Sequence, residues 1–178
     1  WMAEHARQKH RLQALAARGK ALAARLDKRP RLSAALMGAA LGAVIFLAVY
    51  GVRILNPSYV DWLMKPGHDL SQHYMGWGFF RSSSWFFPIG LLDTLGYPYM
   101  TSVMFTDSIP LFAVFFKVLS PLLPASFQYF GLWGLLCYML QGSVGALVCL
   151  RFTRSRPRVL LGSVLLILAP TLVQRLYY

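Results

Sequence analysis

Four aspartates lie together between two strongly apolar parts of this sequence. They are Asp61, Asp69, Asp93 and Asp107, and beyond the first 32 residues the sequence has no other Asp or Glu. A carboxylate can act as a general base or bind a divalent cation. In a chain that is 57% hydrophobic, carboxylates confined to residues 53–126 indicate a reaction or binding site at a membrane surface.

Asp69 is the strongest catalytic candidate because of its neighbours. His68 precedes it and His73 follows four positions later, so on a helix Asp69 and His73 share one face. Asp69 can serve as a general base, while the imidazole of His73 can orient it or donate to a phosphate. Asp69 is equally suited to capping a helix that begins at Leu70. The two roles are compatible.

Further charged residues are candidates for substrate binding. Asp107 is the natural second acid beside Asp69, although its position before an apolar helix also suits an N-cap. Arg81 and Lys117 can meet an anionic headgroup or a lipid-linked phosphate, or can instead lie beside the membrane with their charge in water. Arg175, at the end of the last apolar run, can face the same cavity as Asp69.

The sequence lacks the common motifs of soluble enzymes. It has no HExxH or CxxC spacing and no glycine-rich phosphate loop. Three serines at 82–84 lie outside a nucleophile-elbow context. Cys137 and Cys149 fall in an apolar run, where a thiol is usually a small packing residue. Soluble nucleotide chemistry therefore has no support.

Three apolar runs predict an all-α, polytopic membrane protein. The mean hydropathy is +0.49, which is above the range of ordinary soluble proteins. Residues 33–52 and 127–150 carry no charged side chain and are long enough to cross a hydrocarbon core of roughly 30 Å. Residues 159–174 form a shorter third run. We expect three transmembrane helices, with short interfacial helices in the large loop 53–126.

The distribution of basic residues predicts the orientation. Residues 1–32 hold nine Lys or Arg against Glu4 and Asp27, and the link 151–158 holds four Arg. The positive-inside bias places both on the cytoplasmic side, which requires an even number of crossings between them. Residues 110–124 are therefore expected to form a helix that lies along the outer leaflet or dips into it, and not a further span. The loop 53–126 is then external, and periplasmic if the protein belongs to a bacterial inner membrane.

Two more patterns concern helices and their surroundings. The N-terminal arm, over residues 3–29, is a basic amphipathic helix that either stays solvated and fixes the topology or contacts anionic membrane lipids. It has no interleaved aromatics of the kind that stack on bases, so no nucleic acid partner is expected. Small residues at Gly38, Gly42, Gly142 and Gly145 predict close helix packing.

Several short motifs together resemble a known membrane family. They are residues 67–77 (GHDLSQHYMGW), Arg81, residues 106–111 (TDSIPL) and residues 127–133 (FQYFGLW). They look like an uncharacterised bacterial family placed near the C-type (GT-C) integral membrane glycosyltransferases. The architecture of one span, a large external loop with an early aspartate and further spans also resembles that superfamily.

The resemblance implies an activity. Such enzymes transfer a hexosyl or pentosyl group from a polyprenyl-phosphate donor at the external face. Their early loop acid is catalytic and acts as a base on the acceptor or helps to coordinate a divalent metal, and by position this acid is Asp69. Asp107 would be the second acid, near the acceptor or a divalent cation such as Mg²⁺ or Mn²⁺. Arg81 or His73 would contact the lipid phosphate.

The expected number of spans is lower than in that superfamily, whose members usually have about ten or more. We therefore expect the sequence to be the N-terminal part of a longer chain, or to work with a larger membrane-protein partner. A noncatalytic membrane subunit that binds lipid or such a partner is the alternative function. A transporter component is less favoured because the predicted spans contain no ionisable residue.

Overall fold

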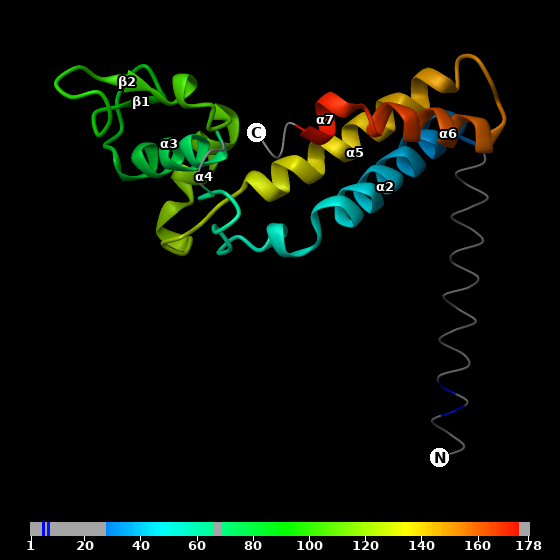
Figure 1. Ribbon diagram of the computed structural model, residues 1–178, viewed down its shortest axis with the longest axis horizontal. Helices are drawn as coiled ribbons and strands as arrows, with labels where there is room; N and C mark the ends of the chain where they lie inside the picture. Colours follow the sequence, from blue (N-terminus) through cyan, green and yellow to red (C-terminus); the bar gives the residue numbers. More distant parts are fainter. Residues whose placement is uncertain (1–4, 6, 8–27, 66–68, 175–178) are drawn as a thin grey trace. The chain divides into compact units, whose positions relative to one another are not determined.

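The computed structural model describes residues 5, 7, 28–65 and 69–174, and Figure 1 draws the other residues as a grey trace. Almost all of the predicted basic helix at residues 3–29, together with His68 and Arg175, therefore lies outside the described residues. The described chain is mostly helical, in agreement with the expected class. It also contains one short hairpin that an all-α description leaves out.

Two compact units make up the chain. The helical unit comprises residues 1–44 and 138–167, and the loop unit comprises residues 45–137 and 168–178. The two longest described helices, α2 (Pro30–Tyr50) and α5 (Phe130–Cys149), contribute part of their length to each unit.

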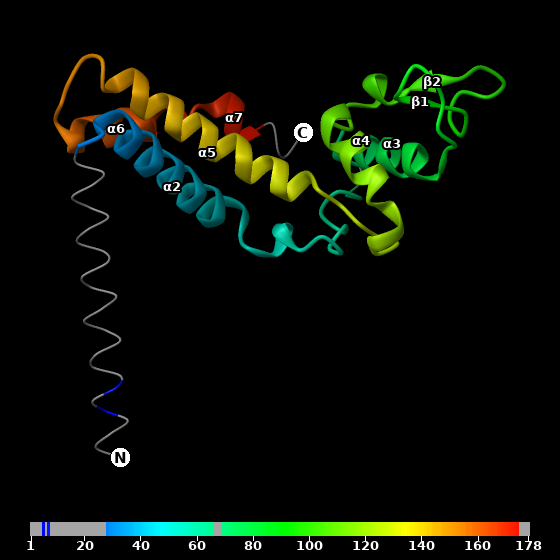
Figure 2. The same ribbon diagram turned by 180° about the vertical axis from the view of Figure 1, so that it is seen from behind.

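The helical unit is held together by glycines. α2 and α5 run alongside each other in both views (Figures 1 and 2), and Gly38 meets the backbone of Gly142 so closely that neither position has room for a Cβ atom. Ser143 Oγ donates to the carbonyl oxygen of Ala35 at 2.9 Å. Ser163 Oγ of α6 (Arg156–Ile167) donates to the Gly142 carbonyl oxygen at 2.9 Å. The predicted packing role of the glycines is confirmed.

Two helices, α2 and α5, are long and apolar enough to cross a membrane. In each, only 28% of the most apolar window is buried inside the protein, and large side chains such as Val44 and Leu140 are more than half exposed. Exposed apolar surface on this scale needs a lipid or protein covering. The helix bounds differ from the predicted spans 33–52 and 127–150 by three residues or fewer at each end.

The predicted third span is not one helix. Residues 159–174 are divided between α6, which ends at Ile167, and the short α7 (Pro170–Gln174). Pro170 has no N–H to continue the hydrogen-bond ladder of α6. With twelve residues, α6 is only about 18 Å long, which is less than the roughly 30 Å of a hydrocarbon core.

The loop unit packs its short elements around a shared core. Those between residues 51 and 129 are, in chain order, η1 (Arg53–Leu55), α3 (Leu70–Ser82), β1 (Leu91–Leu92), β2 (Thr101–Ser102), η2 (Val103–Thr106), α4 (Pro110–Val118) and η3 (Ser120–Leu122). β1 and β2 are antiparallel, with Leu91 opposite Ser102. Trp77, Phe80 and Tyr129 are almost fully buried in this core. The predicted helix over 110–124 is thus α4 followed by a separate 3₁₀ turn.

Candidate functional site

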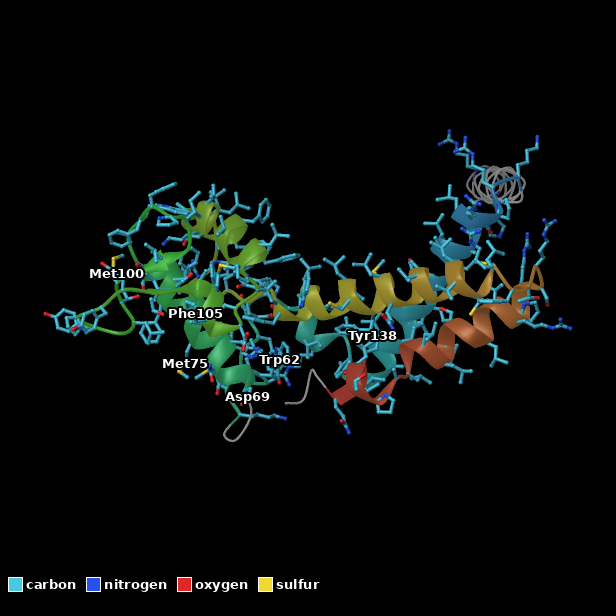
Figure 3. The ribbon with its side chains drawn as sticks, turned by 90° about the horizontal axis from the view of Figure 1, so that it is seen from above. Trp62, Asp69, Met75, Met100, Phe105 and Tyr138 are labelled. Carbon is cyan, nitrogen blue, oxygen red and sulfur yellow. The ribbon has the colours of Figure 1, made fainter. Side chains whose placement is uncertain are left out.

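Helix α3 positions two of the predicted site residues. It begins at Leu70, as the sequence predicts, and Asp69 occupies its N-cap position. The backbone of Asp69 is itself helical, with φ −66° and ψ −18°, and its side chain makes no capping hydrogen bond. The capping role considered for Asp69 is therefore not seen. Its side chain is exposed at the start of α3 (Figure 3), and His73 follows one turn later.

Asp107 lies beside His73. Its Oδ2 atom is 4.0 Å from His73 Nε2, with the Asp107 side chain 75% exposed and that of His73 23% exposed. The predicted cap on α4 is wrong, because the N-cap position of that helix belongs to Ile109. Asp107 instead has a left-handed backbone with φ 52°, which aspartate tolerates better than most residues. The imidazole of His73 thus lies beside one acid, Asp107, and one helical turn from the other, Asp69.

Hydrogen bonds hold the segment that carries Asp107. Ser108 is fully buried, and its Oγ donates to the His73 carbonyl oxygen at 2.7 Å. Thr106 Oγ1 and Ser108 Oγ are 2.8 Å apart, and the Tyr129 hydroxyl donates to the Ser108 carbonyl oxygen. These bonds attach residues 106–108 to α3 and to the segment that leads into α5.

The same segment stores backbone strain. Ile109 has φ 51°, a left-handed conformation that is a true outlier for a β-branched residue and costs about 1–3 kcal/mol. The hydrogen bonds of Ser108 hold the residue that precedes Ile109. On the facing helix, Gly76 leaves space for the side chains of Thr106 and Ser108, which a Cβ at that position would overlap. Strain held in place by surrounding contacts is common at functional sites.

Burial favours the neutral form of His73. Loss of solvent lowers the pKa of His73 below its ordinary value of 6.5, against the opposing attraction of Asp107 and, more weakly, Asp69. The imidazole is therefore mainly neutral at pH 7, with one nitrogen as donor and the other as acceptor. A neutral imidazole beside two carboxylates can take up, hold or pass on a proton.

Arg81 fastens the far end of α3 to the turn before α5. Its Nε donates to Ser120 Oγ at 2.8 Å. Its two terminal nitrogens donate to backbone carbonyl oxygens at 2.8–3.2 Å, those of Ser120, Leu123, Pro124 and Ala125. A guanidinium has five N–H donors, so these bonds leave none for the substrate phosphate that the sequence assigns to Arg81. The geometry gives Arg81 a positioning role.

Lys117 is buried among aromatic rings. Its Nζ lies 4.1 Å from the ring centre of Phe80 and 4.7 Å from that of Trp85, and it donates to the Ser84 carbonyl oxygen at 3.2 Å. Burial lowers the pKa of Lys117, opposed by the charge of Asp93. Lys117 and Arg81 border one cavity of about 440 Å³. Among the described residues, these two predicted cations make their hydrogen bonds with Ser84 and residues 120–125, and not with Asp69, His73 or Asp107.

Asp93 differs in role from the two possible metal ligands, Asp69 and Asp107. Asp93 has a structural role, since its carboxylate accepts from Ser83 Oγ at 2.6 Å. In the part of the chain that the structure describes, no three His, Cys, Asp or Glu side chains gather closely enough to hold a metal ion. Asp69 and Asp107 are the predicted acids that could contribute ligands to a divalent cation.

Two residues that organise the loop unit, Gln128 and Tyr129, are not predicted from the sequence. Gln128 lies within the predicted second span, but its Nε2 donates to the carbonyl oxygens of Ile54 at 2.8 Å and Asn56 at 2.9 Å. Tyr129 packs edge to face with Trp77, with ring centres 5.2 Å apart. Both precede α5 and belong to the loop unit. A lone glutamine at the start of an apolar run is the signal that could have placed the boundary after it.

A groove follows the side of α3 beyond His73. It has a volume of about 350 Å³ and is lined mainly by apolar side chains, among them Met64, Met75, Trp77 and Phe79. Tyr74 and Arg81 also border it. An apolar groove with a few polar groups is the usual form of a small-molecule site.

The fold and the site define a mostly helical protein with two helices able to cross a membrane and a polar cluster in the segment between them. Residues 39–178 match the family described as Domain of unknown function (DUF6311). The match covers more than half of the sequence, so the chain belongs to this family. Neither the curated proteins nor the solved structures that were compared gave a match.

Proposed function

We propose that the protein acts in a membrane glycosyltransferase that uses a polyprenyl-phosphate sugar, with the site formed by Asp69, His73 and Asp107. The observation that carries this proposal is the 4.0 Å approach of His73 Nε2 to Asp107 Oδ2, one helical turn from the uncapped Asp69. The apolar groove beside α3 supports it, because such a groove suits an isoprenoid chain.

The proposed reaction needs one proton acceptor. Asp69 removes the proton from an acceptor hydroxyl as its oxygen bonds to the anomeric carbon of the sugar. The bond between that carbon and the donor phosphate oxygen breaks, and polyprenyl phosphate leaves with the electron pair. Neutral His73 can relay the proton, or can use its one N–H to donate to the phosphate. Asp107, 4.0 Å from His73 Nε2, favours the imidazolium that forms when the ring takes up a proton.

The proposed location is a bacterial inner membrane, with the loop unit at the external face. The basic arm and the arginines of the link 151–158 would then be cytoplasmic, in accordance with the positive-inside bias. The loop unit supports this through its exposed aromatics, since side chains such as Phe87, Tyr97 and Phe105 are at least 80% exposed. Aromatic side chains favour the headgroup region of a bilayer.

The direct test measures release of polyprenyl phosphate by membranes containing the full-length protein. The probes are a panel of synthetic polyprenyl-phosphate hexoses and pentoses. We expect Asp69→Asn to lower the rate by about a hundredfold or more, the usual contribution of a general base. Asp61→Asn is the matched control, because Asp61 is an exposed acid of the same unit outside the cluster, and its rate should equal that of the wild type. Equal rates for both variants, or no release from any donor, would contradict the proposal.

The exposed aromatics also favour the second candidate, a noncatalytic subunit that binds a larger membrane protein. Large exposed apolar patches mark interaction sites in many proteins. In this case the protein should copurify with a partner that alone restores transfer, and Asp69→Asn should leave that restored activity unchanged. Loss of the restored activity in Asp69→Asn would assign catalysis to this chain.

A further inference from the structure

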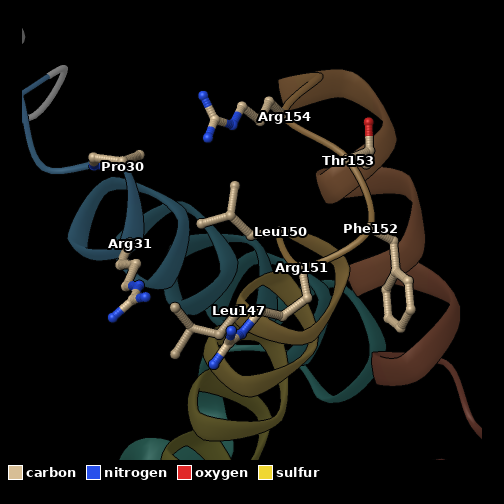
Figure 4. A pocket seen from close by; sticks show the side chains of 8 residues that line it. All are labelled: Pro30, Arg31, Leu147, Leu150, Arg151, Phe152, Thr153 and Arg154. Carbon is tan, nitrogen blue, oxygen red and sulfur yellow. The ribbon is translucent and has the colours of Figure 1, made fainter.

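A cavity at one end of the helical unit is lined by arginines and leucines. It has a volume of about 850 Å³ and lies where α2 begins and α5 ends, lined by Pro30, Arg31, Leu147, Leu150, Arg151, Phe152, Thr153 and Arg154. Figure 4 shows the side chains of Arg31, Arg151 and Arg154 around it, with Leu147 and Leu150 among them. None of these residues belongs to the proposed transfer site.

The charge of this cavity is strongly positive. The described segments of the helical unit from residue 28 onward, 28–44 and 138–167, contain no Asp or Glu. Arg31, Arg151 and Arg154 are exposed and so remain able to bind a ligand. Glu4 and Asp27 fall outside the described residues. Three guanidinium groups around one cavity match an anionic oxygen ligand, for which arginine offers paired N–H donors.

The helix ends refine where an anion would lie. α2 begins at Pro30, and the first turn of a helix presents unpaired N–H groups with a positive partial charge. α5 ends at Cys149, where the partial charge is negative. An anion is therefore favoured on the Arg31 side of the cavity, while Arg151 and Arg154 offset the unfavourable end of α5.

The apolar half of the lining distinguishes among anionic ligands. Leu147 is exposed and Leu150 is half-buried on the last turn of α5, so their side chains can pack against hydrocarbon. Leu150 and Arg154 also border a smaller adjoining cavity of about 60 Å³ that continues to Ala34 and Val159. A free phosphate would leave this surface in water, whereas a phospholipid would cover it.

We propose that this cavity binds the headgroup of an anionic phospholipid, with its phosphate between Arg31, Arg151 and Arg154 and its glycerol and first acyl carbons on Leu147 and Leu150. The inference requires that α2 and α5 cross a membrane, and it is independent of the transferase activity. Basic pockets between membrane helices bind anionic lipid headgroups in this way. The bound lipid would join the start of α2 to the end of α5.

The test is native mass spectrometry of the full-length protein in detergent with added phosphatidylglycerol or phosphatidylcholine. We expect one phosphatidylglycerol to be retained in preference to phosphatidylcholine. The triple variant R31Q/R151Q/R154Q should retain it at least about tenfold less. The matched control K28Q/R29Q/R158Q removes the same charge from exposed positions that do not line the cavity, and it should retain the lipid.

Two further arms separate the outcomes. Inorganic phosphate at millimolar concentration should not displace the lipid, and displacement would overturn the assignment to a phospholipid. Equal losses in the two triple variants would also overturn the proposal, because they would show diffuse attraction to basic residues. Circular dichroism verifies that each variant is still helical. If the cavity triple variant fails to fold, lipid retention by Arg151→Gln is compared with retention by Arg158→Gln, and equal losses would overturn the proposal.

Discussion

The helical unit and the loop unit are stabilised in different ways. In the helical unit, Gly38 and Gly142 have no side chain and so let the backbones of α2 and α5 touch. Two hydrogen bonds from serine hydroxyls to backbone carbonyl oxygens add to the packing. In the loop unit, specific polar groups determine the arrangement, as Arg81, Ser108 and Gln128 bind backbone carbonyl oxygens far away in sequence. The pattern of apolar and small residues specifies the helical unit, while hydrogen bonds from side chains to distant backbone groups specify the loop unit.

This difference has a functional consequence. Glycine packing brings the helices together through backbone contact, and the ligand proposed for the helical unit binds at its arginine-lined end. The polar bonds of the loop unit place the carboxylate of Asp107 beside His73 and hold a strained Ile109 next to it. The proposed chemistry therefore lies where the fold depends on polar contacts.

The largest effect is expected for Gly142→Ala in the helical unit. The new Cβ would overlap the carbonyl group of Gly38, and because backbone atoms cannot rotate away, the helices must separate. We expect a loss of about 3 kcal/mol in the free energy of unfolding, measured in mixed detergent micelles. A change below about 0.5 kcal/mol would show that close backbone contact does not hold this unit together.

A pair of glycines in α3 gives the next largest effect. Gly76→Ala would overlap Thr106 and Ser108, whereas a Cβ at Gly78 meets nothing. We expect Gly76→Ala to cost about 2 kcal/mol and Gly78→Ala to stabilise by about 0.5–1 kcal/mol through helix propensity. Thermal unfolding of both variants measures the contrast. Equal effects in the two variants would contradict the packing of residues 106–108 against α3.

Arg81→Lys should cost about 2 kcal/mol, because an ammonium group cannot reproduce the guanidinium bonds to residues 120–125. Denaturant unfolding measures the loss, and Arg158→Lys, at an exposed position of the helical unit, should change stability by less than about 0.5 kcal/mol. If Arg81 instead binds substrate, Arg81→Lys would keep its stability and weaken donor binding.

The smallest effect concerns pH. The pKa of His73 is lowered in the folded protein, so between that value and about 6.5 the unfolded chain binds more protons. The contribution of His73 to stability is therefore full above about pH 6.5 and is lost as the pH falls through the folded pKa. We expect the melting temperature of His73→Gln to depend less on pH in that window than that of the wild type.

The sequence predicts the parts of the molecule that follow from hydropathy and local signals. Uncharged runs locate α2 and α5, and Asp69 before Leu70 and Pro110 before Leu111 mark the starts of α3 and α4. A helix period also places Asp69 and His73 on one face. These features depend on neighbours within a few residues, so a single sequence contains them.

The remaining features depend on contacts distant in sequence. Arg81 is a plausible phosphate ligand until its bonds to residues 120–125 are seen, 39 to 44 positions away. The pairing of His73 with Asp107 requires the left-handed backbone of a segment held by Ser108 and Tyr129. Charge patterning alone could not show which cations would be buried or bonded.

Asp107 lies 4.0 Å from His73, in a segment held by the hydrogen bonds of residues 106–108. The most direct measurement is an NMR titration of His73 in the full-length protein labelled at histidine, with His73→Gln to assign the signal. We expect the pKa of His73 to lie below 6.5 in the wild type and to fall further in Asp107→Asn, because the carboxylate favours the charged imidazole. A pKa that does not change, or that rises, in Asp107→Asn would contradict the cluster.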